Sequence, residues 1–163
     1  MKKLNIALVA HDSRKHELIE WCKHNRYWLS NHTLYATGTT GNMIENIEIY
    51  DDDLLDDGIK HSIKPLYGRV DKLLSGPLGG DQQIGSMVAE GKIDVLIFFC
   101  DNMVTQGHQQ DVAALSRLAS LYNIAFATNR KTADLIVTSP LILDEEYVSD
   151  VPDVIERYKN RIL

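Results

Sequence analysis

Short apolar runs that alternate with helical patterns constrain the fold of this chain more than any other feature of its sequence. Runs rich in β-branched and aromatic residues cover residues 4–10, 33–36, 93–99 and 124–127. Each run is short enough to be a strand that is buried on both faces of a sheet. The segments between them have the apolar spacing of helices, at residues 16–25, 41–47, 82–90, 112–122 and 132–138. This alternation predicts parallel β/α units joined by right-handed crossovers.

The remainder of the chain completes this expectation. A fifth strand is predicted at residues 141–147, after Pro140, and a terminal helix at 152–162, with Asp150 as its candidate cap. The 163 residues suit one domain, 1–163, with one core. We therefore expect an α/β fold, a doubly wound, mostly parallel five-stranded sheet with helices on both faces.

The segment from residue 45 to residue 73 interrupts the alternation. It begins with a cluster of aspartates at 51–57 and continues with lysines and an arginine at 60–72. Because long irregular segments usually lie on the surface, we expect a solvated excursion here.

Composition limits the partners that this chain can have. Its formal net charge is -6, whereas binding to a duplex normally requires a basic face, so we expect no nucleic-acid partner. No apolar run approaches the roughly 20 residues that a membrane-spanning helix needs. Cysteine occurs only as Cys22 and Cys100, which argues against a disulfide framework and favours a reducing compartment. We expect a cytoplasmic protein that binds no membrane.

Small residues follow the second predicted strand and recur further along the chain. Residues 37–42 read Thr-Gly-Thr-Thr-Gly-Asn, and residues 75–83 read Ser-Gly-Pro-Leu-Gly-Gly-Asp-Gln-Gln. Such loops let backbone amides and hydroxyls approach a phosphate, and the N-terminus of a helix adds a favourable dipole. Asp81 stands where the second of these loops becomes a helix, so it is either an N-cap or a functional carboxylate.

Ionisable side chains follow the other predicted strands. In open parallel sheets, ligands bind beyond the carboxyl ends of the strands, so such residues should gather at one site. A buried carboxylate is costly unless it is paired, so packing alone does not explain Asp101 at the end of an apolar run. The candidates are His11, Asp12, Lys15, Asp101, His108 and Asp111.

Five segments together resemble the methylglyoxal synthase family. They are VAHD at 9–12, ATGTTGN at 36–42, LSGPLGGDQQIG at 74–85, GKIDVLIFF at 91–99 and FATN at 126–129. The resemblance covers most of the chain, and SGPLGGDQQ is its most specific element. It implies a lyase that converts dihydroxyacetone phosphate into methylglyoxal and inorganic phosphate without a metal or organic cofactor. It also implies a homohexamer, with inorganic phosphate as an inhibitor or allosteric ligand.

The resemblance further implies a role for each candidate residue. Asp81 would be the catalytic base and His108 the electrophile, with Asp101 and Asp111 lining the reacting end. The substrate, chiefly its phosphate, would be held by His11, Lys15, Thr37, Gly38, Thr39, Thr40, Ser75 and Gly76. Asp12 would support the first loop. A tail arginine, Arg161 or else Arg157, would pair with Asp12 of another subunit.

The sequence departs from the family pattern in two places and leaves two rivals open. Residues 45–73 look like an insertion, and the loop at 101–111 lacks the prolines that the family often has there. One rival is a regulatory module that binds phosphate or a nucleotide, as in the allosteric domain of carbamoyl phosphate synthetase. Such a module would not need Asp81, Asp101 and His108 together. The other rival is a nucleotide-processing enzyme such as inosinate cyclohydrolase, against which the SGPLGGDQQ block argues.

Overall fold

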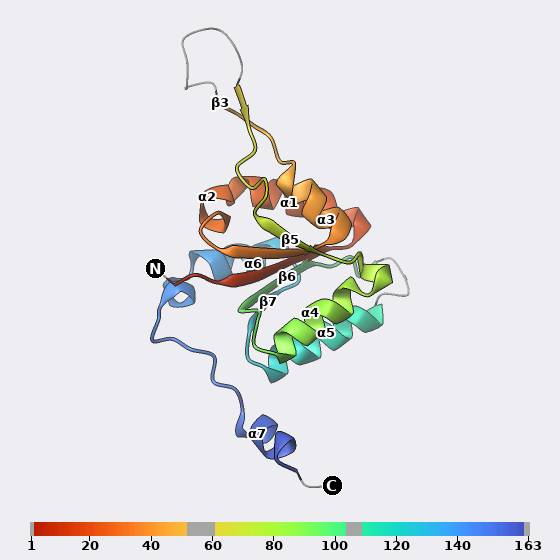
Figure 1. The fold of residues 1–163 in the computed structure, drawn as a ribbon, viewed down its shortest axis with the longest axis vertical. Helices are drawn as coiled ribbons and strands as arrows, with labels where there is room; N and C mark the ends of the chain where they lie inside the picture. Colours follow the sequence, from red (N-terminus) through yellow and green to blue (C-terminus); the bar gives the residue numbers. More distant parts are fainter. Residues whose placement is uncertain (1, 52–60, 104–108, 162–163) are drawn as a thin grey trace.

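Five parallel strands form the centre of the protein. The computed structural model describes residues 2–51, 61–103 and 109–161. The strands are β1 (Asn5–Ala10), β2 (Thr33–Thr37), β5 (Val70–Leu73), β6 (Val95–Phe99) and β7 (Ala125–Ala127). Their order is β5-β2-β1-β6-β7, and each neighbouring pair is parallel. The expected five-stranded sheet is therefore confirmed, and Figure 1 shows β1 running from the N-terminus on the left to the right-hand side.

The alternation of side chains along β1 explains why this strand lies in the middle of the sheet. Ile6, Leu8 and Ala10 pack into a core on one face, and Ala7 and Val9 pack into a second core on the other. All five are buried. A strand that is apolar on both faces is stable only where other elements cover both faces.

Helices cover both faces of the sheet (Figure 1). The first core is covered by α1 (Lys15–His24), α2 (Arg26–Leu29), α3 (Gly38–Glu45) and α6 (Arg130–Thr138). The second core is covered by α4 (Gly80–Ala89) and α5 (Gln109–Leu121). Three 3-10 turns, η1 (Asp12–Arg14), η2 (Gly76–Leu78) and η3 (Pro140–Leu143), connect these elements.

Most of the described side chains between residues 45 and 73 are exposed, as expected of a solvated excursion, but both ends of this segment are built into the fold. β3 (Ile49–Asp51) and β4 (His61–Ile63) form an antiparallel ribbon that extends from the body at the top of Figure 1. The chain then returns through the buried Leu66 and Val70 into β5, the edge strand beside β2. On that strand the ammonium of Lys72 donates to the buried carboxylate of Glu45 at 2.8 Å, which lowers the pKa of Glu45. The end of α3 is thereby tied to the strand that follows the ribbon.

The fifth strand is β5, so the strand predicted at residues 141–147 is wrong. β5 has an apolar residue at Val70 but exposed charges at Asp71 and Lys72, so no apolar run marks it in the sequence. After Pro140 the chain makes the turn η3, whose Ile142 and Leu143 pack against the rim of the first core.

The end of the chain is an extended segment followed by a short helix. α7 (Asp153–Lys159) lies below α5 in Figure 1, and Pro152 rather than the predicted Asp150 is its N-cap. α7 is shorter than the helix predicted at 152–162. None of the helices in the described ranges is long and apolar enough to cross a membrane.

The histidine at the start of β2 should make stability depend on pH. His32 is 6% exposed, and its Nδ1 accepts the backbone N–H of Leu4 at 3.3 Å. Burial lowers the pKa of His32, against a smaller opposing effect of Asp94. The unfolded chain, where a histidine has a pKa of about 6.5, therefore binds a proton more readily than the folded chain does. The free energy of unfolding should consequently fall as the pH falls below that value.

Replacing His32 should flatten this dependence. In His32→Asn the amide oxygen can still accept from Leu4 but does not titrate, so urea unfolding at a series of pH values should show a shallower loss of stability between about pH 7 and pH 5. His24→Asn, on the exposed end of α1, is the matched control and should follow the wild type. Parallel profiles for the wild type and His32→Asn would contradict the assignment.

Candidate active site

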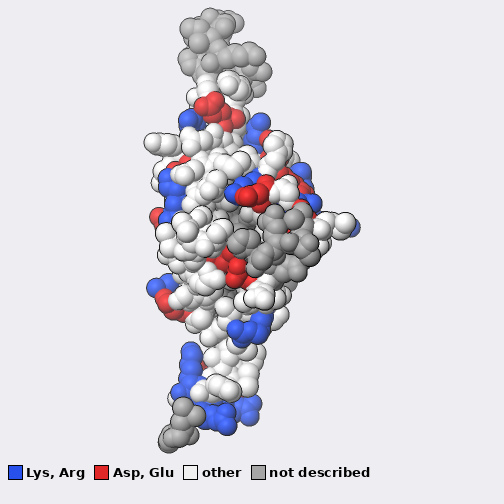
Figure 2. Space-filling view, turned by 90° about the vertical axis from the view of Figure 1, so that its right-hand side faces the viewer, with Lys and Arg blue, Asp and Glu red and all other residues white. Residues whose placement is uncertain are grey.

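A cavity of about 230 Å³ opens at the carboxyl ends of the strands. It lies where the chain leaves β1 toward the helices of the first core and leaves β6 toward those of the second, which is the switch point at which open α/β sheets bind ligands. Figure 2 views the molecule from this side, with acidic side chains near the centre and basic ones gathered at the lower end, around α7. The cavity is lined by Val9, Ala10, His11, Asp12, Lys15, Thr37, Thr39, Ser75, Gly76, Pro77, Asp81 and Phe98.

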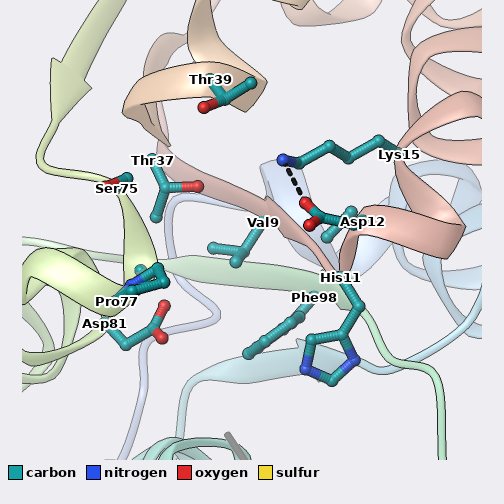
Figure 3. Close-up of a pocket in the computed structure, with 12 residues that line it drawn as sticks. Val9, His11, Asp12, Lys15, Thr37, Thr39, Ser75, Pro77, Asp81 and Phe98 are labelled. Atoms are coloured by element: carbon teal, nitrogen blue, oxygen red, sulfur yellow. Dashed lines mark hydrogen bonds and ion pairs between the residues drawn. The ribbon is translucent and has the colours of Figure 1, made fainter. Parts of the chain in front are cut away.

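One end of the cavity presents hydroxyl groups and a cation. Figure 3 shows Thr39 and Lys15 in the upper part of the view, with Thr37 and Ser75 below Thr39 on the left. Thr37 is the N-cap residue of α3, so the first amides of that helix lie beside these hydroxyls. The ammonium of Lys15 is held 2.6 Å from Oδ1 of Asp12, and its side chain is 19% exposed. This end has the donors that a phosphate requires.

The carboxylate of Asp81 lies at the other end, and the glycines around it explain how it fits there. Asp81 is 6% exposed and belongs to the first turn of α4. Gly79 has φ +105°, and a Cβ on Gly80 would stand 2.1 Å from the carbonyl oxygen of Leu74. A Cβ on Gly76 would stand 3.1 Å from Oδ2 of Asp81. The small residues therefore let the loop fold tightly around the carboxylate.

The N-cap alternative for Asp81 is wrong. The N-cap of α4 is Gly79, in the left-handed conformation, and Asp81 is the second residue of the helix. Its carboxylate instead forms part of the cavity wall (Figure 3). Capping therefore does not explain this buried group, and its functional role stays a prediction.

Two residues predicted to bind phosphate, Thr40 and Gly38, support the loops instead of lining the cavity. The hydroxyl of Thr37 lies 3.4 Å from that of Thr40, which is fully buried. The backbone N–H of Gly38 donates to the carbonyl oxygen of Leu74 at 3.4 Å. The second contact joins the two small-residue loops to each other.

Two predicted acids lie outside the lining of the cavity. Oδ2 of Asp101 accepts the hydroxyl of Ser13 at 2.5 Å, and its Oδ1 accepts the backbone N–H of Met103 at 2.9 Å. Asp111, in the first turn of α5, accepts from the amide of Gln82 at 3.0 Å. With Asp81, Asp111 borders a second cavity of about 330 Å³ between α4 and α5.

Two predicted residues remain, His108 and Arg161. His108 lies outside the described residues. Arg161 lies over the ring of Tyr158 at 5.6 Å, beyond the end of α7, and a pairing with Asp12 stays a prediction.

Sequence reasoning missed the apolar wall and one polar contact. Phe98 could have been found from the alternation along β6, since it shares a core with Val9 of β1 and both end near the cavity. Pro77 lies within the loop that the motif marks, but no role was assigned to it. No signal in the sequence marks Ser13, because its partner Asp101 is 88 residues away.

The two thiols are poorly suited to nucleophilic catalysis. Burial raises the pKa of the Cys100 thiol to about 11, and the fully buried Cys22 is shifted further in the same direction. Both are therefore protonated at neutral pH, whereas the thiolate is the reactive form. Within the described ranges, no group of three or more His, Cys, Asp or Glu side chains is arranged to hold a metal ion.

Comparison with known proteins agrees with this geometry. The family model described as "MGS-like domain" matches residues 17–128. The methylglyoxal synthase of Proteus mirabilis is 46% identical over 158 residues, 97% of this chain and 91% of that protein. The methylglyoxal synthase of Maridesulfovibrio salexigens is 50% identical over 145 residues, 88% of each chain.

A solved structure extends the likeness to the fold. The crystal structure of methylglyoxal synthase from Elizabethkingia anophelis NUHP1 superposes with a TM-score of 0.78 and 40% sequence identity. The match covers 99% of this chain and 93% of that one. With this agreement over nearly the whole sequence and fold, the chain belongs to the methylglyoxal synthase family.

Proposed function

We propose that the cavity at the ends of β1, β2, β5 and β6 converts dihydroxyacetone phosphate into methylglyoxal and inorganic phosphate. The observation that carries the proposal is the buried carboxylate of Asp81 opposite a set of phosphate donors in one cavity. The reaction needs a base at a carbon and an anion site a few bonds away from it. Membership of the family supplies the substrate class. The two ends of the cavity match the two ends of such a substrate, its hydroxyl-bearing carbon and its phosphate.

The first step is removal of a proton from the hydroxyl-bearing carbon beside the ketone. Asp81 takes this proton as general base, and the electron pair moves onto the carbonyl oxygen to form an enediolate. A neutral imidazole that donates a hydrogen bond to that oxygen stabilises the charge, the role predicted for His108. The low exposure of Asp81 keeps water away from the reacting carbon.

The second step is elimination of phosphate. The hydroxyl of the enediolate loses its proton and becomes the aldehyde, while the carbon–oxygen bond to phosphate breaks and its electron pair leaves with the phosphate. The enolate that remains takes up a proton at its methylene carbon to become methylglyoxal. The ester bond must stand out of the enediolate plane to overlap with the π system. Thr37, Thr39, Ser75 and Lys15 surround the end of the cavity where the leaving group would be held. Their hydroxyls and the ammonium stabilise the charge that phosphate gains.

The alternative function, a regulatory module, would use the phosphate end of the cavity but has no use for the end that holds Asp81. A module that only binds an anion gains nothing from a buried carboxylate beside it, because like charges repel and burial is costly. The placement of Asp81 in the same cavity as Lys15 therefore favours catalysis.

The finer expectations of the family resemblance are part of this proposal. They are a homohexamer, regulation by inorganic phosphate and a cytoplasmic location. The predicted link would pair Arg161 with Asp12 of another subunit, and the Asp12 side chain is 89% exposed while it contacts Lys15 in its own chain.

Replacing Asp81 should abolish most of the activity without unfolding the protein. Asp81→Asn keeps the size of the side chain but removes the base, so turnover should fall by at least roughly 10²- to 10⁴-fold. The measurement is exchange of the substrate's carbon-bound proton with deuterated solvent, alongside formation of methylglyoxal and phosphate in equal amounts.

The matched control is Asp71→Asn, an exposed carboxylate on β5 outside the cavity. It should keep wild-type rates, and Asp81→Asn should still bind inorganic phosphate. If Asp81→Asn retains both proton exchange and product formation at near wild-type rates, Asp81 is not the base.

Replacing hydroxyls at the other end should weaken anion binding. Inorganic phosphate should compete with the substrate, and Thr39→Ala and Ser75→Ala should each weaken its binding because each removes a hydroxyl from the cavity wall. Calorimetric titration with phosphate measures the effect. Thr138→Ala, at an exposed position of α6 outside the cavity, is the control. Unchanged affinity in both cavity variants would show that the loops have been misassigned.

Removal of the tail cation should alter cooperativity if subunits are linked through it. Arg161→Ala should change the Hill coefficient for phosphate inhibition, whereas loss of an ordinary exposed cation should leave it unchanged. Steady-state rates over a phosphate series provide the measurement. An unchanged Hill coefficient would reject the link.

A further inference from the structure

A hydroxyl to which no role has been assigned connects the loops that follow β1 and β6. Ser13, in the turn η1, donates through Oγ to Oδ2 of Asp101 at 2.5 Å. The two residues are 88 positions apart, so the contact exists only because β1 and β6 are neighbours in the sheet. It holds the start of the loop at residue 101 against the end of β1.

The same aspartate fixes the backbone around it. Its second oxygen, Oδ1, accepts the N–H of Met103 at 2.9 Å, which closes a local turn. The backbone N–H of Asp101 then donates to Nδ1 of His11 at 2.8 Å. A continuous series of hydrogen bonds therefore leads from Ser13 through Asp101 to the imidazole of His11.

The last of these bonds determines which nitrogen of His11 carries the proton. Because Nδ1 accepts a hydrogen bond, the proton of the neutral ring lies on Nε2. Nε2 is buried and has no hydrogen-bond partner among the residues that the structure describes. A buried donor without a partner is costly, so a ligand in the cavity is the natural acceptor for it.

The position of the ring indicates which part of a ligand it would meet. The imidazole packs edge-on against Phe98, with 5.1 Å between ring centroids. Figure 3 shows His11 and Asp81 on either side of Phe98, whereas Thr39 and Lys15 lie toward the opposite end. In this view His11 thus lies at the end of the cavity that holds the base, away from Thr39 and the ammonium of Lys15.

We propose that His11 donates from Nε2–H to the carbonyl oxygen of the substrate, and that Ser13 is a positioning residue that holds it there through Asp101. The proposal rests on the proposed function and revises the expectation that His11 holds chiefly the phosphate. His11 supplies a hydrogen bond to the oxygen on which negative charge develops while Asp81 takes the carbon-bound proton. No proton leaves the imidazole in this step.

The test compares Ser13→Ala, Ser13→Thr and Ser86→Ala. Ser86 is the matched control because it is an exposed serine that also donates to a carboxylate, that of Glu90, at 2.9 Å. Ring nitrogen chemical shifts of His11, assigned with His11→Gln, report the tautomer independently of activity. Steady-state kinetics with dihydroxyacetone phosphate and titration with inorganic phosphate report the two ends of the cavity separately.

We expect the wild type to show the Nε2–H tautomer, and Ser13→Ala to show a mixture of tautomers. Turnover of Ser13→Ala should fall, by up to about 100-fold, because a misplaced group costs rate without loss of binding. Its phosphate affinity should stay at the wild-type value. Ser13→Thr keeps the hydroxyl and should restore both the tautomer and the rate, and Ser86→Ala should match the wild type.

Two results would overturn the proposal. One is a Ser13→Ala variant with wild-type turnover and an unchanged His11 spectrum. The other is a Ser13→Ala variant with weakened phosphate binding and unchanged turnover, which would place His11 at the phosphate end. If the wild type forms no methylglyoxal while Ser13→Ala still shifts the His11 tautomer, the proposed function fails and the positioning by Ser13 is supported.

Discussion

From Ile6 to Ala10 the apolar side chains of β1 alternate to both faces while the backbone bonds to a strand on each side, so polar groups can appear only at the ends of the strand, at Asn5 and beyond Ala10. The rest of the structure depends on this constraint. The same burial applies to β6, whose five residues are all buried, and its first polar side chains also come at its carboxyl end. Parallel strands end at one edge, and ionisable groups that the core cannot hold are therefore collected there.

The site that results combines opposite requirements within a small volume. A carboxylate acts as a base at a carbon only where water is scarce, and a phosphate is bound best where many donors converge. Glycines reconcile the two, because a Cβ on Gly76 would press on the carboxylate of Asp81 and a Cβ on Gly80 would collide with the backbone of Leu74. The glycines of the loop bury less apolar surface than larger residues would, and the carboxylate loses part of its hydration. Sites that carry such local costs are usually supported by a rigid frame, here the sheet behind them.

The sequence predicts an element correctly where its residue pattern has a single structural cause. β1 and β6 are buried along almost their whole length, β2 and β7 have no exposed residue, and all four are visible as apolar runs, whereas β5 has exposed charges and is not. The range 141–147 begins with three apolar residues for a different reason, since Ile142 and Leu143 cover the rim of a core from a turn. In the site, loops that follow strands reveal His11, Thr39, Ser75 and Asp81. The contact between Ser13 and Asp101 is absent from any local pattern because only strand order creates it.

The ribbon of β3 and β4 leaves the body after α3, and the chain then returns into β5. Contacts between residues that precede β3 and residues that follow β4 hold the two ends of this segment together. Lys72 binds Glu45, and Lys64 contacts Asn46 and Glu48 at 3.1 and 3.5 Å. These contacts bring together the ends of the segment. A longer segment should therefore change the free energy of unfolding little, because each doubling of a flexible loop costs only about 0.6 kcal/mol. A foreign peptide inserted between β3 and β4 would therefore join the body through residues that already contact one another. This position is accordingly suited to the insertion of an additional sequence into the enzyme.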